Sequence, residues 1–95
     1  MNLNTIFELL NENKKNGVRF NEILLNNDNI KLEYYSGFGV CEYFYIYNNY
    51  ISYYKHSFNN SFKGCAETII LDDITHLSDK EIVLFILNFL TDNIN

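Results

Sequence analysis

The sequence has 95 residues, 47% hydrophobic and 17% aromatic, which suits a single domain (residues 1–95) with a small core, stable by about 5–10 kcal/mol. Its 12 acidic and 7 basic residues give a net charge of −5, which opposes the phosphate neutralisation that nucleic-acid binders need and so disfavours direct nucleic-acid binding. The longest apolar run, Ile82 to Leu87, is far shorter than the roughly 20 residues that span a membrane, and no signal-peptide pattern opens the chain, so we expect a cytoplasmic protein without membrane contact.

The first predicted element is an amphipathic helix over roughly residues 3–15. Its apolar positions recur at helical spacing, Asn2 or Asn4 is available as the cap, and Gly17 follows its end. The next stretch, from Val18 to Asn29, is ambiguous. Its start suits a short strand, Asn21 to Leu25 has the composition of a helical turn, and the four residues after it are typical of a loop.

Three strands are predicted next. Apolar and charged residues alternate from Ile30 to Tyr35, as in a half-buried strand, and residues 36–39 then turn the chain. Val40 to Tyr47 is the second strand and Tyr50 to His56 the third. Asn48 and Asn49 between them form a two-residue hairpin turn, because asparagine tolerates the positive φ that such turns require.

This turn predicts a register and divides the side chains of the hairpin between two faces. Phe44 lies opposite Tyr53, and a three-residue loop through Gly37, Phe38 and Gly39 places Leu32 opposite Phe44. The inner face carries Val40, Phe44, Ile46, Ile51 and Tyr53, with a Glu42–Lys55 pair toward the open end. The outer face carries Ser52 and five tyrosines: Tyr43, Tyr45, Tyr47, Tyr50 and Tyr54.

A fourth strand from Cys65 to Leu71 is predicted without a preferred inward parity. The C-terminal helix begins at a capping box of Ser78 and Glu81. Its apolar residues cover more than half of its circumference, so we expect it to be packed between the first helix and the sheet, or to form a dimer. The predicted fold class is α+β, with an N-terminal helix, a three- to four-stranded antiparallel meander and a C-terminal helix packed on one face.

Catalytic and metal-binding patterns are weak. The register places Cys41 opposite His56, a combination used in thiol catalysis, but a buried thiol beside a histidine at a strand end explains it better. Cys41 and Cys65 are expected to be free thiols, and with the two histidines their spacing matches no zinc site. The acidic residues near the last turn, Asp72, Asp73, Asp79 and Glu81, are explained by a loop and a helix N-terminus. We therefore predict no enzyme activity, no metal and no cofactor.

The outer tyrosines are the best functional candidate. Tyrosine offers a large, stiff ring with a polar tip, so exposed tyrosines with the acidic neighbours Glu33 and Glu67 would suit a protein-binding site. The structural alternative is that another layer of the same chain covers these rings. With only two predicted helices, we expect that layer to be missing if both helices lie on the aliphatic side.

Joint enrichment in Asn, Lys, Ile, Tyr and Phe, without Pro or Trp, is typical of an A+T-rich bacterial or phage genome. In size, acidity and order of elements the whole chain resembles the small phage-encoded anti-CRISPR inhibitors, although no residue motif carries the resemblance. It implies a non-enzymatic inhibitor of a bacterial CRISPR effector or other nuclease, acting in the host cytoplasm. The alternatives are a toxin-immunity protein and a sponge for a signalling nucleotide, and a homodimer remains open.

Overall fold

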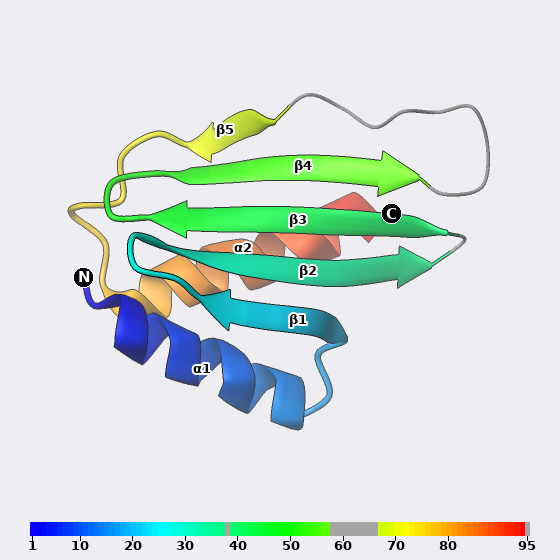
Figure 1. The fold of residues 1–95 in the computed structure, drawn as a ribbon, viewed down its shortest axis with the longest axis horizontal. Coiled ribbons are helices and arrows are strands. Elements are labelled where there is room, and N and C mark those ends of the chain that lie inside the picture. The colour runs from blue at the N-terminus through cyan, green and yellow to red at the C-terminus, as the bar shows by residue number, and fades with distance from the viewer. Residues whose placement is uncertain (38, 58–66, 95) are drawn as a thin grey trace.

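The computed structural model describes residues 1–37, 39–57 and 67–94 and confirms the α+β fold class (Figure 1). Within these residues the helices are α1 (Leu3–Lys15) and α2 (Asp79–Ile94). The strands are β1 (Phe20–Leu25), β2 (Asn29–Gly37), β3 (Val40–Tyr47), β4 (Ile51–Ser57) and β5 (Thr68–Leu71). They lie side by side in chain order, each antiparallel to its neighbours, as the predicted meander requires.

The strand count was predicted too low, because the described residues form a sheet of five strands. The helical-turn interpretation of Asn21 to Leu25 is wrong, since these residues belong to β1. Phe20 pairs with Tyr34 and Ile23 with Leu32, but the register shifts between Phe20 and Glu22. This irregularity interrupts the alternation of apolar residues, so the sequence of β1 lacks the regular pattern of a strand. The fourth predicted strand is described from Thr68 onward as β5, while residues 65 and 66 lie outside the described residues.

The predicted register of the central strands is confirmed. Leu32 pairs with Phe44, Phe44 with Tyr53 and Ile46 with Ile51. The hairpin closes where the Tyr47 amide donates to the Tyr50 carbonyl at 2.9 Å.

Glu42 lies opposite Lys55 as predicted, but its carboxylate has a different partner. The side chain is only 2% exposed, on the inner face of β3, and it accepts a hydrogen bond of 2.5 Å from the Tyr53 hydroxyl. A buried carboxylate needs such a donor, because burying it without one is costly.

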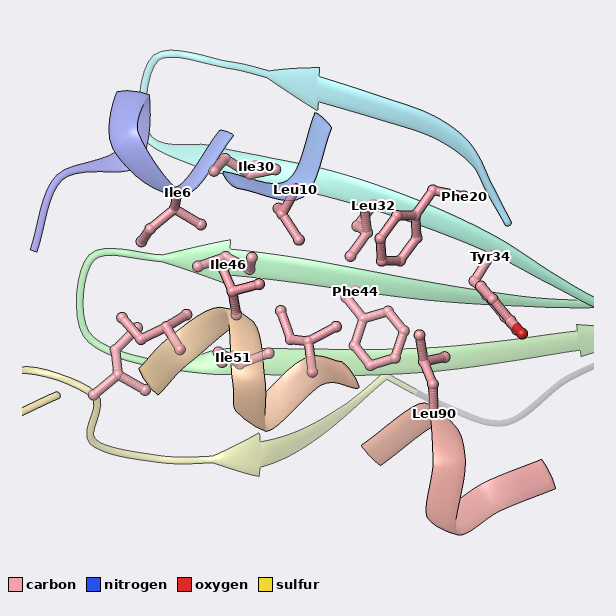
Figure 2. Close-up of a cluster of buried hydrophobic side chains, with 14 residues drawn as sticks. Ile6, Leu10, Phe20, Ile30, Leu32, Tyr34, Phe44, Ile46, Ile51 and Leu90 are labelled. Atoms are coloured by element: carbon pink, nitrogen blue, oxygen red, sulfur yellow. The ribbon is translucent and has the colours of Figure 1, made fainter. Parts of the chain in front are cut away.

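The core lies between the inner face of the sheet and the helices. Figure 2 shows Ile6 and Leu10 of α1 and Leu90 of α2 close to side chains of β2, β3 and β4. Phe89 of α2 packs edge-on against Phe44, with ring centroids 5.6 Å apart. The fully buried members of this cluster are Ile6, Leu10, Ile30, Leu32, Phe44, Ile46, Ile51, Ile74, Ile82 and Ile86.

Helix α2 contacts both α1 and the sheet, but α1 also contacts β1 and β2 directly, so the two helices pack next to each other on the sheet. The prediction that α2 is enclosed between α1 and the sheet is therefore wrong. In Figure 1, α2 passes behind β2 and β3, while α1 lies along the edge formed by β1. Leu84 of α2 faces away from the core and is 56% exposed. No helix in the described part of the chain is long and apolar enough to cross a membrane.

The two helices begin next to each other. The Asn2 side chain caps α1 by accepting from the Asn4 amide at 2.9 Å, and the Asn2 amide donates to Asp79 Oδ1 at 3.0 Å. The predicted capping box is confirmed: the Ser78 amide donates to Glu81 Oε1 at 2.9 Å, and the Glu81 amide to Ser78 Oγ at 3.2 Å. These local hydrogen bonds set where α1 and α2 start.

The parity of β5, which the sequence left open, follows from its pairing with β4. Leu71 pairs with Ile51 on the inner face, and Ile69 pairs with Ser52 on the outer face, with an irregularity between the two pairs. Ile69 is accordingly 56% exposed, whereas Ile70 packs against the core.

Candidate functional site

The five tyrosines predicted for the outer face lie there together, and we call them the tyrosine face: Tyr43, Tyr45, Tyr47, Tyr50 and Tyr54. Side chains alternate between the faces of a strand, so these rings point away from the side on which Phe44 and Ile46 meet the helices. All five are half-buried. Neither α1 nor α2 covers this face, and the rings that touch them belong to the inner side of the sheet.

The rings hold one another in place. Tyr47 and Tyr50 stack across the hairpin, with centroids 4.7 Å apart and planes inclined by 23°. Tyr43 and Tyr54 form a second cross-strand pair at 5.6 Å, and the Tyr54 ring stacks in turn on His56 at 6.2 Å. Cross-strand aromatic pairs of this kind restrict ring motion, so a partner would lose little additional side-chain entropy on binding them.

A shallow hollow of about 320 Å³ lies in this face, lined by Lys31, Tyr43, Tyr45, Tyr54 and His56. Lys31 reaches in from β2, where it stands opposite Tyr45. Its Nζ lies 5.7 Å from the centroid of the Tyr43 ring and 4.0 Å from Glu22 Oε1. The hollow therefore combines aromatic ring surface with polar groups from three neighbouring strands.

The two acidic residues of the predicted site lie beside different tyrosines. Glu33 stands opposite Tyr43, and burial together with the Glu33 charge raises the pKa of Tyr43 to about 12. Burial raises the pKa of Tyr47 as well, and there the next contribution is the charge of Glu67. Both hydroxyls therefore keep their protons at neutral pH and remain hydrogen-bond donors. The structure does not bring Glu33 and Glu67 into one cluster.

Cys41 lies opposite His56 as the register predicted, and it is buried. Burial is the largest influence on the thiol and the neighbouring Glu33 charge the next, and both raise its pKa. A thiol nucleophile reacts as the thiolate, so this environment opposes thiol catalysis. Cys65 lies outside the described residues, and with it the disulfide and zinc alternatives that depended on it.

The acidic residues before α2 form local turns. Asp73 accepts hydrogen bonds from the Thr75 amide and hydroxyl, at 3.0 and 2.6 Å, and these lower the pKa of its carboxyl. The Ser78 hydrogen bonds likewise lower the pKa of Glu81. Among the described residues there is no group of three or more His, Cys, Asp or Glu side chains placed to hold a metal ion.

Three residues of this face were not singled out from the sequence as site residues: Lys31, His56 and Ser52. The predicted register already implied Lys31 opposite Tyr45, because it placed Leu32 opposite Phe44. Ser52 is fully buried in the same cross-strand row, and its hydroxyl has no hydrogen-bond partner among the described residues. Its burial depends on the rings around it, which a register alone does not describe.

Comparison of this chain with protein-family models, with curated proteins and with solved structures gave no match. Its function is accordingly inferred from its own residues.

Proposed function

We propose that this protein is a non-enzymatic inhibitor that binds a bacterial nuclease or defence complex, such as a CRISPR effector, through the tyrosine face together with Glu33 and Glu67. The observation that carries the proposal is the position of the five half-buried rings. They lie on the face of the sheet opposite α1 and α2. Within the described residues these rings are therefore available to a partner.

A protein partner suits this surface because tyrosine supplies contact area at low entropic cost and keeps a polar tip for hydrogen bonding. The ring pairs Tyr47–Tyr50 and Tyr43–Tyr54 are arranged before any partner arrives. The raised pKa values of Tyr43 and Tyr47 place the loss of their hydroxyl protons still further from neutral pH, so both hydroxyls can donate to a partner. Such groups are common among the residues that dominate binding energy at protein interfaces.

The charge favours a basic partner surface. The chain carries a net charge of −5, and Glu33 and Glu67 flank the tyrosine face at separate points. A nuclease has a positively charged channel for nucleic acid, and complementary charge speeds association and selects among partners. The proposed inhibitor would occupy that channel with carboxylates at its edge and aromatic contacts at its centre, in the host bacterial cytoplasm.

The test is a DNA-cleavage assay with purified, guide-loaded CRISPR effector nucleases, supported by a pull-down from a lysate of a low-GC bacterium. We expect the native protein to inhibit at least one effector, and the triple variant Tyr43→Ala, Tyr45→Ala, Tyr47→Ala to lose inhibition and capture together. Leu84→Ala is the matched control, because Leu84 is exposed on α2, away from the tyrosine face. It should behave as the native protein does.

Inhibition that persists in the triple variant would contradict the proposal. Capture of a toxin in place of a nuclease, with toxicity relieved in cells, would instead support the immunity-protein alternative. Calorimetry with cyclic nucleotides addresses the remaining alternative. The hollow offers such a ligand Lys31 for its phosphates and Tyr43, Tyr45 and Tyr54 for its base, so tight binding there would favour a nucleotide sponge.

A further inference from the structure

Glu33 is a carboxylate that forms no ion pair with any cation in the described part of the chain. It is half-buried on β2, opposite Tyr43, and its charge affects both Tyr43 and Cys41. The ion pairs found among the described residues are Lys31 with Glu22 and His76 with Asp73, so neither includes Glu33. Because a partner would exclude water from this position, the carboxylate would need a positive group from that partner.

The adjacent ring already accepts a cation. Lys31 Nζ lies over Tyr43 at 5.7 Å from the ring centroid, within the range of a cation–π interaction. The same ammonium pairs with Glu22 at 4.0 Å, and Glu22 stands opposite Glu33 on β1, so among the described residues the ion pair of Lys31 is with Glu22 and not with Glu33. Tyr43 therefore offers a ring face that attracts positive charge, and it stands opposite a carboxylate, Glu33, that is paired with no cation of residues 1–37, 39–57 and 67–94.

We propose that the hollow between Lys31, Tyr43, Tyr45, Tyr54 and His56 receives an arginine side chain of the protein partner, with its guanidinium against the tyrosine rings and paired with Glu33. The inference rests on the proposed function, since it names the group by which a basic partner would engage the tyrosine face. The hollow, at about 320 Å³, has room for one long side chain.

Arginine suits this position better than lysine for three physical reasons. The guanidinium is planar and stacks on aromatic rings, it forms two parallel hydrogen bonds to a carboxylate, and it loses water more easily than an ammonium does. An anionic group is the opposing candidate, because Lys31 and His56 also line the hollow. The two candidates predict opposite responses to removing charge at Glu33 and at Lys31.

The experiment titrates N-acetyl-arginine amide into the full chain carrying ¹³C-labelled tyrosine and follows the ring signals by NMR. We expect saturable shifts at Tyr43, Tyr45 and Tyr54, with smaller changes at Tyr47 and Tyr50, which lie outside the lining. The citrulline analogue, which has the same shape without the charge, should bind at least about tenfold more weakly. Equal binding of the two probes would overturn the inference.

Charge variants make the test specific. Glu33→Gln should weaken arginine binding about tenfold, and Lys31→Gln should strengthen it by about twofold to fivefold by removing a like charge. Glu12→Gln is the matched control, because Glu12 is exposed on α1, on the other side of the sheet from the tyrosine face. A loss in Glu12→Gln equal to that in Glu33→Gln, or tighter binding of N-acetyl-glutamate amide than of the arginine probe, would overturn the proposal. Unchanged urea midpoints would show that the variants remain folded.

The arginine inference and the proposed inhibitor function can be disproved independently of each other. A nuclease that is captured through the tyrosines but is held equally well by Glu33→Gln would overturn the arginine anchor and leave the inhibitor proposal standing. Saturable arginine binding in a protein that inhibits no nuclease would support the anchor and count against the nuclease target.

Discussion

At the scale of residues, successive positions on β3 meet different environments. Phe44 is fully buried against Phe89, whereas its neighbours Tyr43 and Tyr45 are half-buried on the opposite face. A tyrosine in that position keeps its ring against the sheet and its hydroxyl near solvent. The same strand thus contributes to the core with one set of side chains and to the candidate site with the other.

Ser52 gives the first prediction at this scale. Its hydroxyl is buried without a partner among the described residues, and an unsatisfied buried group of this kind costs about 1–3 kcal/mol. Ser52→Ala should raise the free energy of unfolding by about 0.5–1 kcal/mol, after a small loss of strand propensity, as measured by urea denaturation. Ser36→Ala is the control and should destabilise, because the Ser36 hydroxyl donates to the Val40 carbonyl at 3.2 Å. A larger loss from Ser52→Ala than from Ser36→Ala would disprove this account.

Tyr43 gives the second prediction at this scale. Its pKa of about 12 means that the folded state favours the neutral phenol over the phenolate, while an unfolded tyrosine titrates near 10. The stability from Tyr43 is therefore complete below about pH 10 and is lost as the pH rises toward 12. Ring ¹³C titration by NMR should show Tyr43 titrating late, and Tyr43→Phe should flatten this part of the stability profile.

Glu33→Gln separates the two causes of the shift. It should lower the pKa of Tyr43 but leave it above the ordinary value, because burial contributes more than the Glu33 charge. A Tyr43 signal that titrates near pH 10 in the native protein would contradict both statements.

At the scale of elements, the helix N-termini show which hydrogen bonds can be predicted from local sequence and which cannot. The capping box of α2 consists of two reciprocal hydrogen bonds between residues three apart, so Ser78 and Glu81 are sufficient to predict it. The hydrogen bond from the Asn2 amide to Asp79 joins residues 77 apart, and no local pattern predicts it. It depends on the packing that brings the starts of α1 and α2 together.

The capping box supports the third prediction. Ser78→Ala should lower the free energy of unfolding by about 1 kcal/mol, because the Glu81 amide loses its acceptor. The Ser78 backbone amide, which the variant keeps, contributes most to the lowered pKa of Glu81, and the Ser78 side chain contributes next. Part of the effect should therefore be lost at acid pH, because the side-chain contribution is lost as the pH falls through that pKa. Asn88→Ala, at an exposed position of α2, is the control and should be neutral or slightly stabilising. Urea denaturation at about pH 7 and near pH 3 compares the two, and a loss that is independent of pH would argue against a role for the carboxylate.

Strands were predictable where their neighbours in sequence are their neighbours in the sheet. The hairpin of β3 and β4 follows from Asn48 and Asn49 and carries the register with it, so the tyrosine face is predictable from local sequence. β1 was predicted only at its start, because the register shift after Phe20 interrupts its alternation. The hollow was missed for a different reason: it depends on where the Lys31 and His56 side chains reach, which strand alternation does not determine.

At the scale of the whole molecule, the layers separate the core from the candidate site. Both helices pack on the inner face, so the side chains that stabilise the fold and the rings proposed to bind a partner lie on opposite sides of the same sheet. From the sequence, this separation could be predicted only for the case in which both helices pack on the aliphatic face, because the sequence does not show on which face α1 and α2 pack. The order of the strands does not determine on which face of the sheet the helices pack. That face is identified by the apolar residues of both helices, which pack in one cluster with Phe44 and Ile46.

The division leads to the last prediction, which compares Phe44→Ala with Tyr45→Ala. Phe44 is fully buried, so its truncation should cost about 3–5 kcal/mol, a large part of the roughly 5–10 kcal/mol expected for this domain. Tyr45 is half-buried on the other face and should cost about 1 kcal/mol. Urea denaturation followed by circular dichroism gives both values. If the two losses are equal, the tyrosine face stabilises the fold as the core does, and lost binding in tyrosine variants would reflect unfolding. If they differ as expected, Tyr45→Ala remains folded at about 25 °C, and its loss of partner binding can be assigned to the surface itself.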